Sequence, residues 1–252
     1  MSKIVITAAC RVGCVRVNNE DMVLVFDKLV RSDVYKTEVR TENLDRFVVA
    51  LADGMGGHNA GEVASEETLK NLRFFVNDLP CDLTPQSFVK AMHEWLDFIN
   101  QRVNAMGLVD ASMQNMGTTL VALLYYAGRY YWMNCGDSRL YRLRDNRLQL
   151  ITTDHSLNTL NGSAKHSNII TNCIGAGCKN SYIDMQEITA DVVVGDTYLL
   201  CSDGLNDMVA DTDIEMLLAD GANANRLCEA AIAKGGYDNV STCVMRIEAE
   251  AE

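Results

Sequence analysis

The spacing of apolar residues divides the chain into short strands and helices. Continuous or alternating apolar runs, which are typical of strands, end in Gly, Asn or Asp turns. Two strands joined by a turn are expected within residues 4–26, and further strands at 47–52, 118–126, 129–135, 139–144, 148–152, 196–201 and 241–247. Because short turns separate several of these strands, we expect antiparallel pairing.

Helices are expected where apolar residues recur every three or four positions. One such segment spans 62–79, and a second spans 85–106, with a Thr-Pro start and a Gly end. Shorter helices are expected at 212–219 and 225–234, whereas the charged residues 27–46 indicate an exposed loop or hairpin. Strands at both ends with helices between them predict an α+β fold, with two antiparallel sheets covered by helices.

Length and composition bound the number of domains and the compartment. With 252 residues, 48% apolar content, two prolines and no low-complexity linker, residues 1–252 are expected to form a single domain. Residues 1–6 lack the apolar core of a signal peptide, and no stretch approaches the roughly 18 apolar residues of a membrane span. Nine cysteines without a Cys-x-x-Cys pair fit a reducing compartment, so we expect a cytoplasmic protein with no membrane partner.

The charge balance excludes one class of partner. The net charge is −12 and the pI is about 4.8, whereas sequence-independent nucleic-acid binding needs a surface rich in Lys and Arg. Most of the 34 acidic residues are expected on the solvated surface. A few of them, however, stand at glycine-flanked ends of apolar strands.

Asp53 is the clearest of these acidic residues. It follows the apolar run Phe47–Ala52 and precedes the glycine-rich stretch Gly54-Met55-Gly56-Gly57. Glycines allow the backbone to approach a ligand closely, which indicates a strand that delivers a carboxylate to a pocket. Considered alone, an Asp-Gly pair after a strand is equally typical of a hairpin turn.

Other acidic residues repeat this setting. Asp137 lies in a Gly-Asp-Ser turn, Asp203 ends another apolar strand, and Asp238 precedes the last strand; Glu20 and Asp21 are additional candidates. If the fold gathers these carboxylates, their repulsion requires cations, and oxygen ligands select Mg²⁺ or Mn²⁺ rather than zinc. Two such ions roughly 3.5–4 Å apart can share a carboxylate and activate water for attack on phosphorus.

Arg16 precedes Glu20 and Asp21 in the second expected strand. Adjacent residues of a strand point to opposite faces, so at most one of the two carboxylates faces a pocket directly unless the strand bends there. A guanidinium group binds two phosphate oxygens at once, which makes Arg16 a candidate phosphate ligand. An ordinary surface ion pair is the alternative interpretation of Arg16.

Seven short motifs occur in order along the chain. They are Arg16-x-x-Asn19-Glu20-Asp21, Asp53-Gly54-Met55-Gly56-Gly57-His58 with Gly61-Glu62-x-Ala64-Ser65, Gly117-Thr118-Thr119, Gly136-Asp137-Ser138-Arg139-x-Tyr141, Thr152-x-Asp154-His155-Ser156, Ser202-Asp203-Gly204-Leu205 and Gly236-x-Asp238-Asn239. Together they resemble the motifs of the metal-dependent serine/threonine protein phosphatases, the PPM or type 2C family, in its bacterial form. Each motif alone is weak, but the ordered set covers nearly the whole chain and is highly specific.

The resemblance implies a fold, an activity and partners. The fold would be a four-layer α-β-β-α sandwich with a metal centre at one end of its sheets. The activity would be hydrolysis of phosphoserine and phosphothreonine on proteins by a metal-activated water, without a phosphoenzyme. The partners would be phosphorylated proteins and a bacterial Ser/Thr kinase whose action the enzyme reverses, and the enzyme would be a monomer.

The resemblance also assigns the metal ligands. Asp53 would bridge two Mn²⁺ or Mg²⁺ ions, and the Gly54 carbonyl would bind one of them. Asp203 and Asp238 would complete the other site, which makes these two and Asp53 the expected catalytic residues. Asp137 would hold a third ion together with Asp203.

Three residues of the first motif receive roles in the same way. Glu20 matches a position that acts mainly through metal-bound water, and Asp21 is the weaker metal candidate beside it. Arg16 would bind the phosphate of the substrate.

Two features depart from the family pattern. Met55 stands where many eukaryotic members have a histidine that is proposed as general acid, so water or another group would protonate the leaving alcohol. His58 and His155 are candidate donors, although structural roles are favoured for both. The segment from Ser156 to Asn168 is shorter than the usual bacterial flap, which borders the active site and influences substrate choice and binding of the third ion.

Two other functions remain open at this point. A catalytically idle regulatory module could use the same fold, although a scaffold has no need to gather unpaired carboxylates. A phosphatase acting on small metabolites could use the same chemistry. Relative rates on phosphopeptides and metabolites would separate that enzyme from a protein phosphatase.

Overall fold

The computed structural model describes residues 2–56, 60–157, 159 and 169–249. Its strands are β1 (Ser2–Arg11), β2 (Met22–Val25), β3 (Lys28–Val30), β4 (Val34–Arg40), β5 (Arg46–Ala52), β6 (Gly54–Met55), β7 (Gly117–Thr118), β8 (Leu120–Tyr126), β9 (Arg129–Cys135), β10 (Arg139–Arg144), β11 (Arg147–Leu150), β12 (Ile174–Gly175), β13 (Asp184–Glu187), β14 (Thr197–Cys201) and β15 (Val240–Ala249). Its helices are α1 (Gly61–Asp78), α2 (Pro85–Val109), α4 (Asp203–Asn206), α5 (Asp211–Ala219) and α6 (Ala224–Ala233), with short 3-10 turns at Thr41–Asn43, Ala111–Met113 and Thr189–Asp191.

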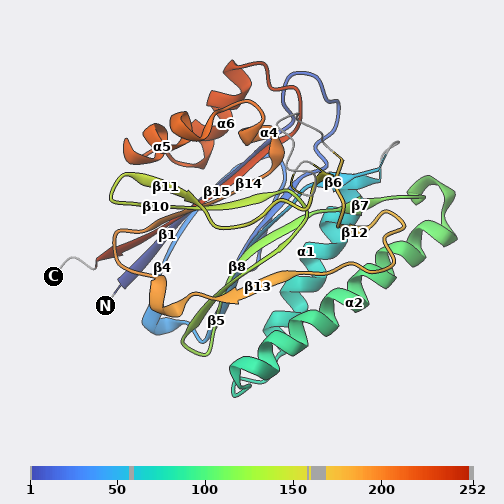
Figure 1. Ribbon diagram of the computed structural model, residues 1–252, viewed down its shortest axis with the longest axis horizontal. Coiled ribbons are helices and arrows are strands. Elements are labelled where there is room, and N and C mark those ends of the chain that lie inside the picture. Colours follow the sequence, from blue (N-terminus) through green and yellow to red (C-terminus); the bar gives the residue numbers. More distant parts are fainter. Residues whose placement is uncertain (1, 57–59, 158, 160–168, 250–252) are drawn as a thin grey trace.

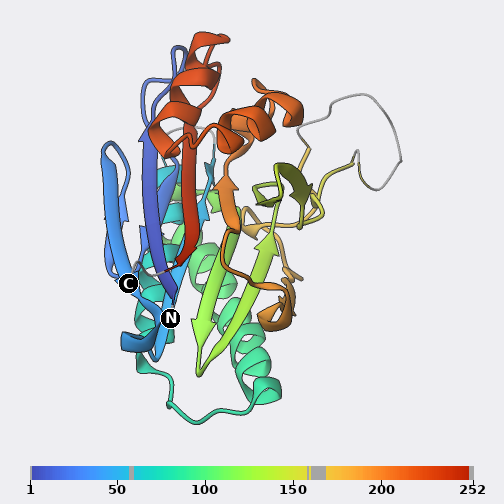
Figure 2. The ribbon, with the colours of Figure 1, turned by 90° about the vertical axis from the view of Figure 1, so that its left-hand side faces the viewer.

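Two six-stranded antiparallel sheets stack face to face between two layers of helices (Figures 1 and 2). One sheet has the strand order β11-β10-β14-β15-β1-β4, and the other has the order β13-β9-β8-β5-β2-β3. Helices α5 and α6 cover the outer face of the first sheet, and α1 and α2 cover the outer face of the second (Figure 1). The expected α+β fold, a four-layer α-β-β-α sandwich, is confirmed.

Strand β5 explains why apolar runs without a polar face lead to this sandwich. Val48 and Ala50 pack in the core beneath α1 and α2, whereas Val49 and Leu51 pack in the core between the two sheets. Because successive side chains of a strand point to opposite faces, a strand between two apolar layers must be apolar throughout. The run that leads to Asp53 is therefore fixed on both sides.

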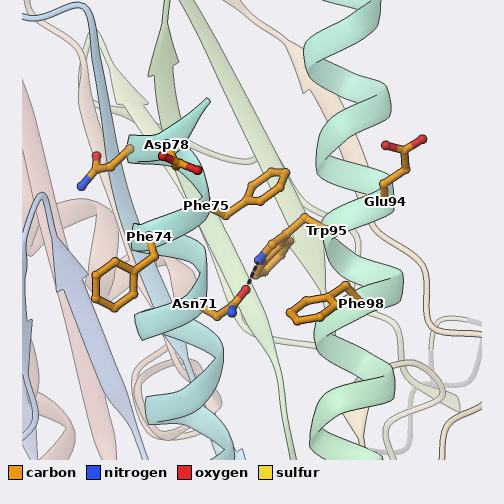
Figure 3. Close-up of a pocket in the computed structure, with 8 residues that line it drawn as sticks. Asn71, Phe74, Phe75, Asp78, Glu94, Trp95 and Phe98 are labelled. Atoms are coloured by element: carbon orange, nitrogen blue, oxygen red, sulfur yellow. Dashed lines mark hydrogen bonds between the residues drawn. The ribbon is translucent and has the colours of Figure 1, made fainter. Parts of the chain in front are cut away.

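The two long helices pack against each other as well as against the sheet. Helix α2 begins as predicted, because the Thr84 hydroxyl accepts a hydrogen bond from the Ser87 amide at 3.2 Å. Between the helices, the Trp95 indole nitrogen donates to the Asn71 side-chain oxygen at 2.8 Å, and the Trp95 ring lies 6.4 Å from that of Phe75 (Figure 3). None of the helices in the described ranges is both long and apolar enough to cross a membrane.

Three local predictions were wrong. The second strand begins at Met22, so Arg16 and Glu20 lie in a loop and not on a strand. Residues 27–46 are not a single exposed excursion, because they contribute β3 to one sheet and the edge strand β4 to the other. Helix α2 continues through Gly107 to Val109, since its packing against the sheet outweighs the low helix propensity of one glycine.

Candidate metal centre

The backbone of Asp53 is held between two strands. Its amide donates to the Thr119 hydroxyl at 3.0 Å, and its carbonyl accepts from the Thr119 amide at 2.9 Å and from the Thr118 hydroxyl at 2.8 Å. The Thr119 hydroxyl in turn lies 2.7 Å from that of Ser138, beyond the end of β9. These hydrogen bonds fix the backbone at the end of β5, where the Asp53 side chain enters the cleft.

Gly54 stands where three segments meet. A Cβ atom at this position would lie 2.2 Å from the Gly61 carbonyl oxygen and 2.5 Å from the Glu20 carbonyl oxygen. Since both contacts are to backbone atoms, no side chain fits here. The sequence associated Gly54 with close approach to a ligand. In the structure Gly54 allows close approach of α1 and of the loop that carries Glu20.

Asn239 positions that loop, a role that the sequence analysis did not assign to it. Its side-chain oxygen accepts from the Glu20 amide at 2.8 Å, and its side-chain nitrogen donates to the carbonyls of Val12 and Asn18, each at 2.9 Å. The Ser65 hydroxyl also donates to the Glu20 carbonyl, at 2.6 Å. The available signal was the amide side chain directly after Asp238, because Asn is suited to bonding irregular backbone.

Asp21 lies beneath the cleft. It is fully buried, and one carboxylate oxygen accepts from the Ser202 hydroxyl at 2.8 Å. The other oxygen, Oδ1, has no hydrogen-bond partner among the residues that the structure describes. Burial raises the pKa of Asp21 to about 6. Asp21 therefore places a carboxylate with one unbonded oxygen behind Asp53, although Asp21 does not line the cleft itself.

The other predicted acidic residues converge from three further chain segments. Asp137 follows β9, Asp203 is the first residue of α4, and Asp238 precedes β15. With Glu20 and Asp53 they line a cleft of about 840 Å³ at one end of the sheets. Gly54 and Arg16 line the same cleft. Apart from Asp21, the sequence-predicted site residues are thus brought together.

Four carboxylates of this cleft, those of Glu20, Asp53, Asp137 and Asp203, resist ionisation. Burial raises the pKa of Asp53 well above its usual range, and the charges of Asp21, Asp203 and Asp137 raise it further. Burial, followed by the charge of Asp137, raises the pKa of Asp203 to about 8. Burial also raises the pKa of Asp137 to about 6, and it raises the pKa of Glu20. A positive charge placed among these groups would be strongly favoured.

Arg16 supplies a cation at the rim. Its guanidinium donates to Asp238 Oδ2 at 2.7 Å, and both side chains are partly exposed. The pKa of Arg16 is raised, chiefly by this hydrogen bond. The ion pair considered for Arg16 is therefore present, and its partner is one of the carboxylates of the cleft.

The donor set fits hard divalent cations such as Mn²⁺ and Mg²⁺. Among the described residues that line the cleft, Arg16 is the one cation facing five carboxylates. These groups offer only oxygen ligands, which such ions prefer. Within the described part of the chain, no three His, Cys, Asp or Glu side chains form a group that could already hold one ion.

His155 has a structural position beside the cleft, as the sequence analysis favoured. Its Nδ1 atom accepts from the Gly136 amide at 3.1 Å, and its Nε2 atom lies 3.1 Å from a carboxylate oxygen of Asp184. It thereby supports the turn that carries Asp137. Met55 lines the cleft, whereas His58 lies outside the described residues, as does most of the segment from 156 to 168.

Comparison with known proteins gives a consistent result. Residues 27–233 match the family described as protein phosphatase 2C. The serine/threonine phosphatase Stp of Listeria welshimeri is 31% identical over 222 residues, which cover 81% of this chain and 86% of that protein. The serine/threonine protein phosphatase PstP of Mycobacterium tuberculosis is 34% identical over 242 residues, which cover 92% of this chain but 43% of that protein.

The fold comparison includes a metal-bound structure. The catalytic domain of a PstP phosphatase in complex with two manganese ions superposes with a TM-score of 0.74 at 31% identity, over 98% of this chain and all of that one. Its two ions agree with the two-metal site expected from the sequence. The family match over most of the length, together with the relative that is 34% identical, shows that this chain belongs to the protein phosphatase 2C family.

Proposed function

We propose that this chain is a Mn²⁺- or Mg²⁺-dependent phosphatase that hydrolyses phosphoserine and phosphothreonine on proteins. The observation that carries the proposal is the convergence of five carboxylates and Arg16 on one cleft. A stable fold has no use for five carboxylates that share a single cation, because burying charge without a partner costs free energy. A cleft that binds cations and phosphate uses all of them.

We assign the metal ligands as the resemblance to the family implies, and the gathering of these carboxylates at one cleft supports the assignment. Asp53, Asp203 and Asp238, with the Gly54 carbonyl, would hold the two core ions, and Asp137 would hold a third with Asp203. Bound Mn²⁺ or Mg²⁺ supplies an acidified water and neutralises negative charge on the phosphoryl group.

The remaining residues of the cleft position the reactants. Arg16, at the rim, would hold two phosphate oxygens and so orient the phosphorus toward the cleft. Glu20, whose backbone is fixed by Asn239 and Ser65, would orient water at the ligand shell. Asp21 would support the site from below by adding negative charge beneath Asp53.

The cellular role is also a proposal. Phosphoprotein substrates fit a cleft that opens at the surface and whose phosphate-binding cation lies at the rim. The curated relatives are bacterial serine/threonine phosphatases. We therefore place the enzyme in cytoplasmic signal transduction, opposite a bacterial Ser/Thr kinase, with residues 1–252 acting as a single monomeric phosphatase domain.

The test is phosphate release from a phosphothreonine peptide, with Mn²⁺ and with chelator, by the wild type and by Asp53→Asn. We expect release that requires Mn²⁺ and is lost in the variant. A well-folded, Mn²⁺-loaded protein that releases no phosphate from any peptide would refute the proposal. If metabolite phosphates were hydrolysed faster than peptides, a small-molecule phosphatase would replace it.

A further inference from the structure

A second hollow lies directly beside the catalytic cleft. It has a volume of about 480 Å³ and is formed by the C-terminal part of α2, the following turn and residues 177–179. Gly177 and Cys178 line both this hollow and the catalytic cleft. We call it the flank hollow. A ligand in the cleft could extend over this shared wall without leaving the surface.

The shared wall is held in place by two side chains of α2. Asn100 accepts from the Gly175 amide at 2.8 Å, and Asn104 accepts from the Gly177 amide at 2.9 Å. Both asparagines also donate to the Cys178 carbonyl, at 3.0 and 3.1 Å. The backbone is left-handed at Gly175, Ala176 and Gly177, with φ values of 80°, 49° and 74°. The four asparagine hydrogen bonds hold the wall in this conformation.

The chemistry of the flank hollow differs from that of the cleft. Val103, Met113, Met116 and Leu108 give it an apolar lining. No carboxylate is among the described residues that line it, although the chain carries a net charge of −12. Lys179 lies at its edge and is exposed, and no ion pair of its side chain is found within the described chain. The hollow therefore suits an apolar side chain with an acidic neighbour.

Amide side chains complete the lining. Gln101, Gln114 and Asn115 are exposed there, and their side chains have no hydrogen bond within the described residues. Free amide groups can donate to and accept from the main chain of an extended peptide. The hollow thus combines an apolar pocket with groups that recognise a polypeptide backbone, which is the usual composition of a peptide-binding subsite.

We propose that the flank hollow binds the substrate polypeptide next to the phosphorylated residue, with one apolar side chain in the hollow and an acidic side chain near Lys179. The occupant is the substrate itself, because the hollow shares the wall formed by Gly177 and Cys178 with the cleft, and because the positive charge of Lys179 complements an acidic side chain. This inference rests on the proposed phosphatase function. It makes the hollow a determinant of substrate choice rather than of catalysis.

The test uses phosphothreonine peptides with alanine flanks, in which a single leucine is moved through the four positions on either side. We expect leucine at one favoured position to lower KM about three- to tenfold, as partial burial of a leucine predicts, with kcat little changed. Glutamate next to that position should improve kcat/KM by about two- to fivefold, as expected for an exposed ion pair. The rate on p-nitrophenyl phosphate, which has no flanking residues, provides the baseline.

Matched variants locate the effect on the protein. Leu108 lines the hollow and Val109 does not, and each is 89% exposed, so neither alanine substitution should disturb folding. Leu108→Ala should abolish the leucine preference and Lys179→Gln the glutamate preference, whereas Val109→Ala should retain both. As a readout independent of turnover, the leucine peptide should shift the backbone NMR signals of Gly107, Gly177 and Lys179 more than the alanine peptide does.

Two outcomes would overturn the inference and are distinguishable. If phosphopeptides are hydrolysed but leucine has no favoured position, or if Leu108→Ala and Val109→Ala behave alike, the hollow is not a subsite and the phosphatase function stands. If p-nitrophenyl phosphate is hydrolysed but no phosphopeptide is, the protein phosphatase function falls, and the subsite falls with it.

Discussion

The catalytic cleft and the groove between α1 and α2 are two hollows of similar size whose linings differ in chemistry. The groove encloses about 600 Å³. It is lined by Asn71, Phe74, Phe75, Asn77, Asp78, Glu94, Trp95 and Phe98 (Figure 3). Its polar indole nitrogen is satisfied by Asn71, and its other rings provide mostly apolar surface. The cleft, by contrast, is lined by five carboxylates that face one cation, Arg16.

Helix α1 connects the two regions and shows what separates them. Its first residue, Gly61, packs against Gly54 and against the Glu20 side chain at the candidate metal centre, and its last, Asp78, lines the groove. The groove can be accounted for by the packing of two amphipathic helices, which leaves aromatic edges exposed. Packing does not account for the cleft in this way, because gathering five carboxylates around one cation weakens the fold. Unsatisfied charge, more than volume or apolar area, therefore marks the functional site.

The largest effect expected from this contrast is on activity. Asp203→Asn should lower Mn²⁺-dependent phosphate release at least about a thousandfold, because metal ligands supply several kcal/mol of transition-state stabilisation. Asp78→Asn, the matched change in the groove, should leave the rate within about twofold, since isolated surface substitutions have small effects. Initial rates on one phosphothreonine peptide measure both. Equal losses of rate in the two variants would show that the cleft is no more important for activity than the groove.

Asp203→Asn, which lowers activity, should raise stability at pH 8 when metal is removed. The raised pKa of Asp203, about 8, means that the folded protein retains a proton that the unfolded chain has released. The unfolded state then binds fewer protons, so stability falls as pH rises from about 4 to about 8. With chelator, Asp203→Asn should therefore melt like wild type near pH 4 and higher than wild type at pH 8. Scanning calorimetry at both pH values measures this, and a variant that melts lower at pH 8 would contradict it.

Cations should restore the stability that the carboxylates remove. Ions that bind the folded cleft and not the unfolded chain stabilise it by about 2.7 kcal/mol at a hundredfold excess over Kd. For a chain of this length that corresponds to a rise in Tm of roughly 5–10 °C. Asp78→Asn should keep the full rise and Asp203→Asn should lose most of it. A rise that survives in Asp203→Asn would place the stabilising ion elsewhere.

Arg16 should affect binding more than the chemical step. Its hydrogen bond to Asp238 is exposed and holds the guanidinium at the rim of the cleft. Arg16→Ala should lower kcat/KM about tenfold to a hundredfold, the range expected when one charged hydrogen bond is lost. Arg16→Lys should recover part of it, because the charge is kept and the bidentate geometry is lost. Unchanged KM and kcat for phosphopeptides would leave Arg16 as the partner of Asp238 alone.

Much of this architecture was predictable because local signals and packing agree. The run before Asp53 lies between two apolar layers, so its sequence had to be apolar on both faces. The Thr84-Pro85 start of α2 is a local capping signal, and the structure retains it. The strand ends that carry Asp137 and Asp203 were found because a glycine next to each acid interrupts an apolar run. Gly136 directly precedes Asp137, and Gly204 directly follows Asp203.

The parts that were missed depend on contacts distant in sequence. The loop that carries Glu20 is shaped by Asn239, which is 219 residues away, and no local pattern encodes that bond. Strand β13 is polar because it lies at a sheet edge, where exposed positions need no apolar residue. The flank hollow likewise forms only when residues 177–179 fold back onto α2. The acidic residues could therefore be located from the sequence, whereas the residues that position and surround them could be identified only from the fold.

The smallest expected effect is the sharpest test of the contrast. Phe98 lines the groove and is 54% exposed, so Phe98→Ala should lower stability by no more than about 1 kcal/mol, well below the cost of truncating a buried aromatic residue. Activity on phosphopeptides and the Mn²⁺-dependent rise in Tm should both match wild type. A selective loss of activity in this variant, with Tm unchanged, would show that the groove communicates with the cleft. Helix α1 would then be the connecting element, because its two ends contact the two regions.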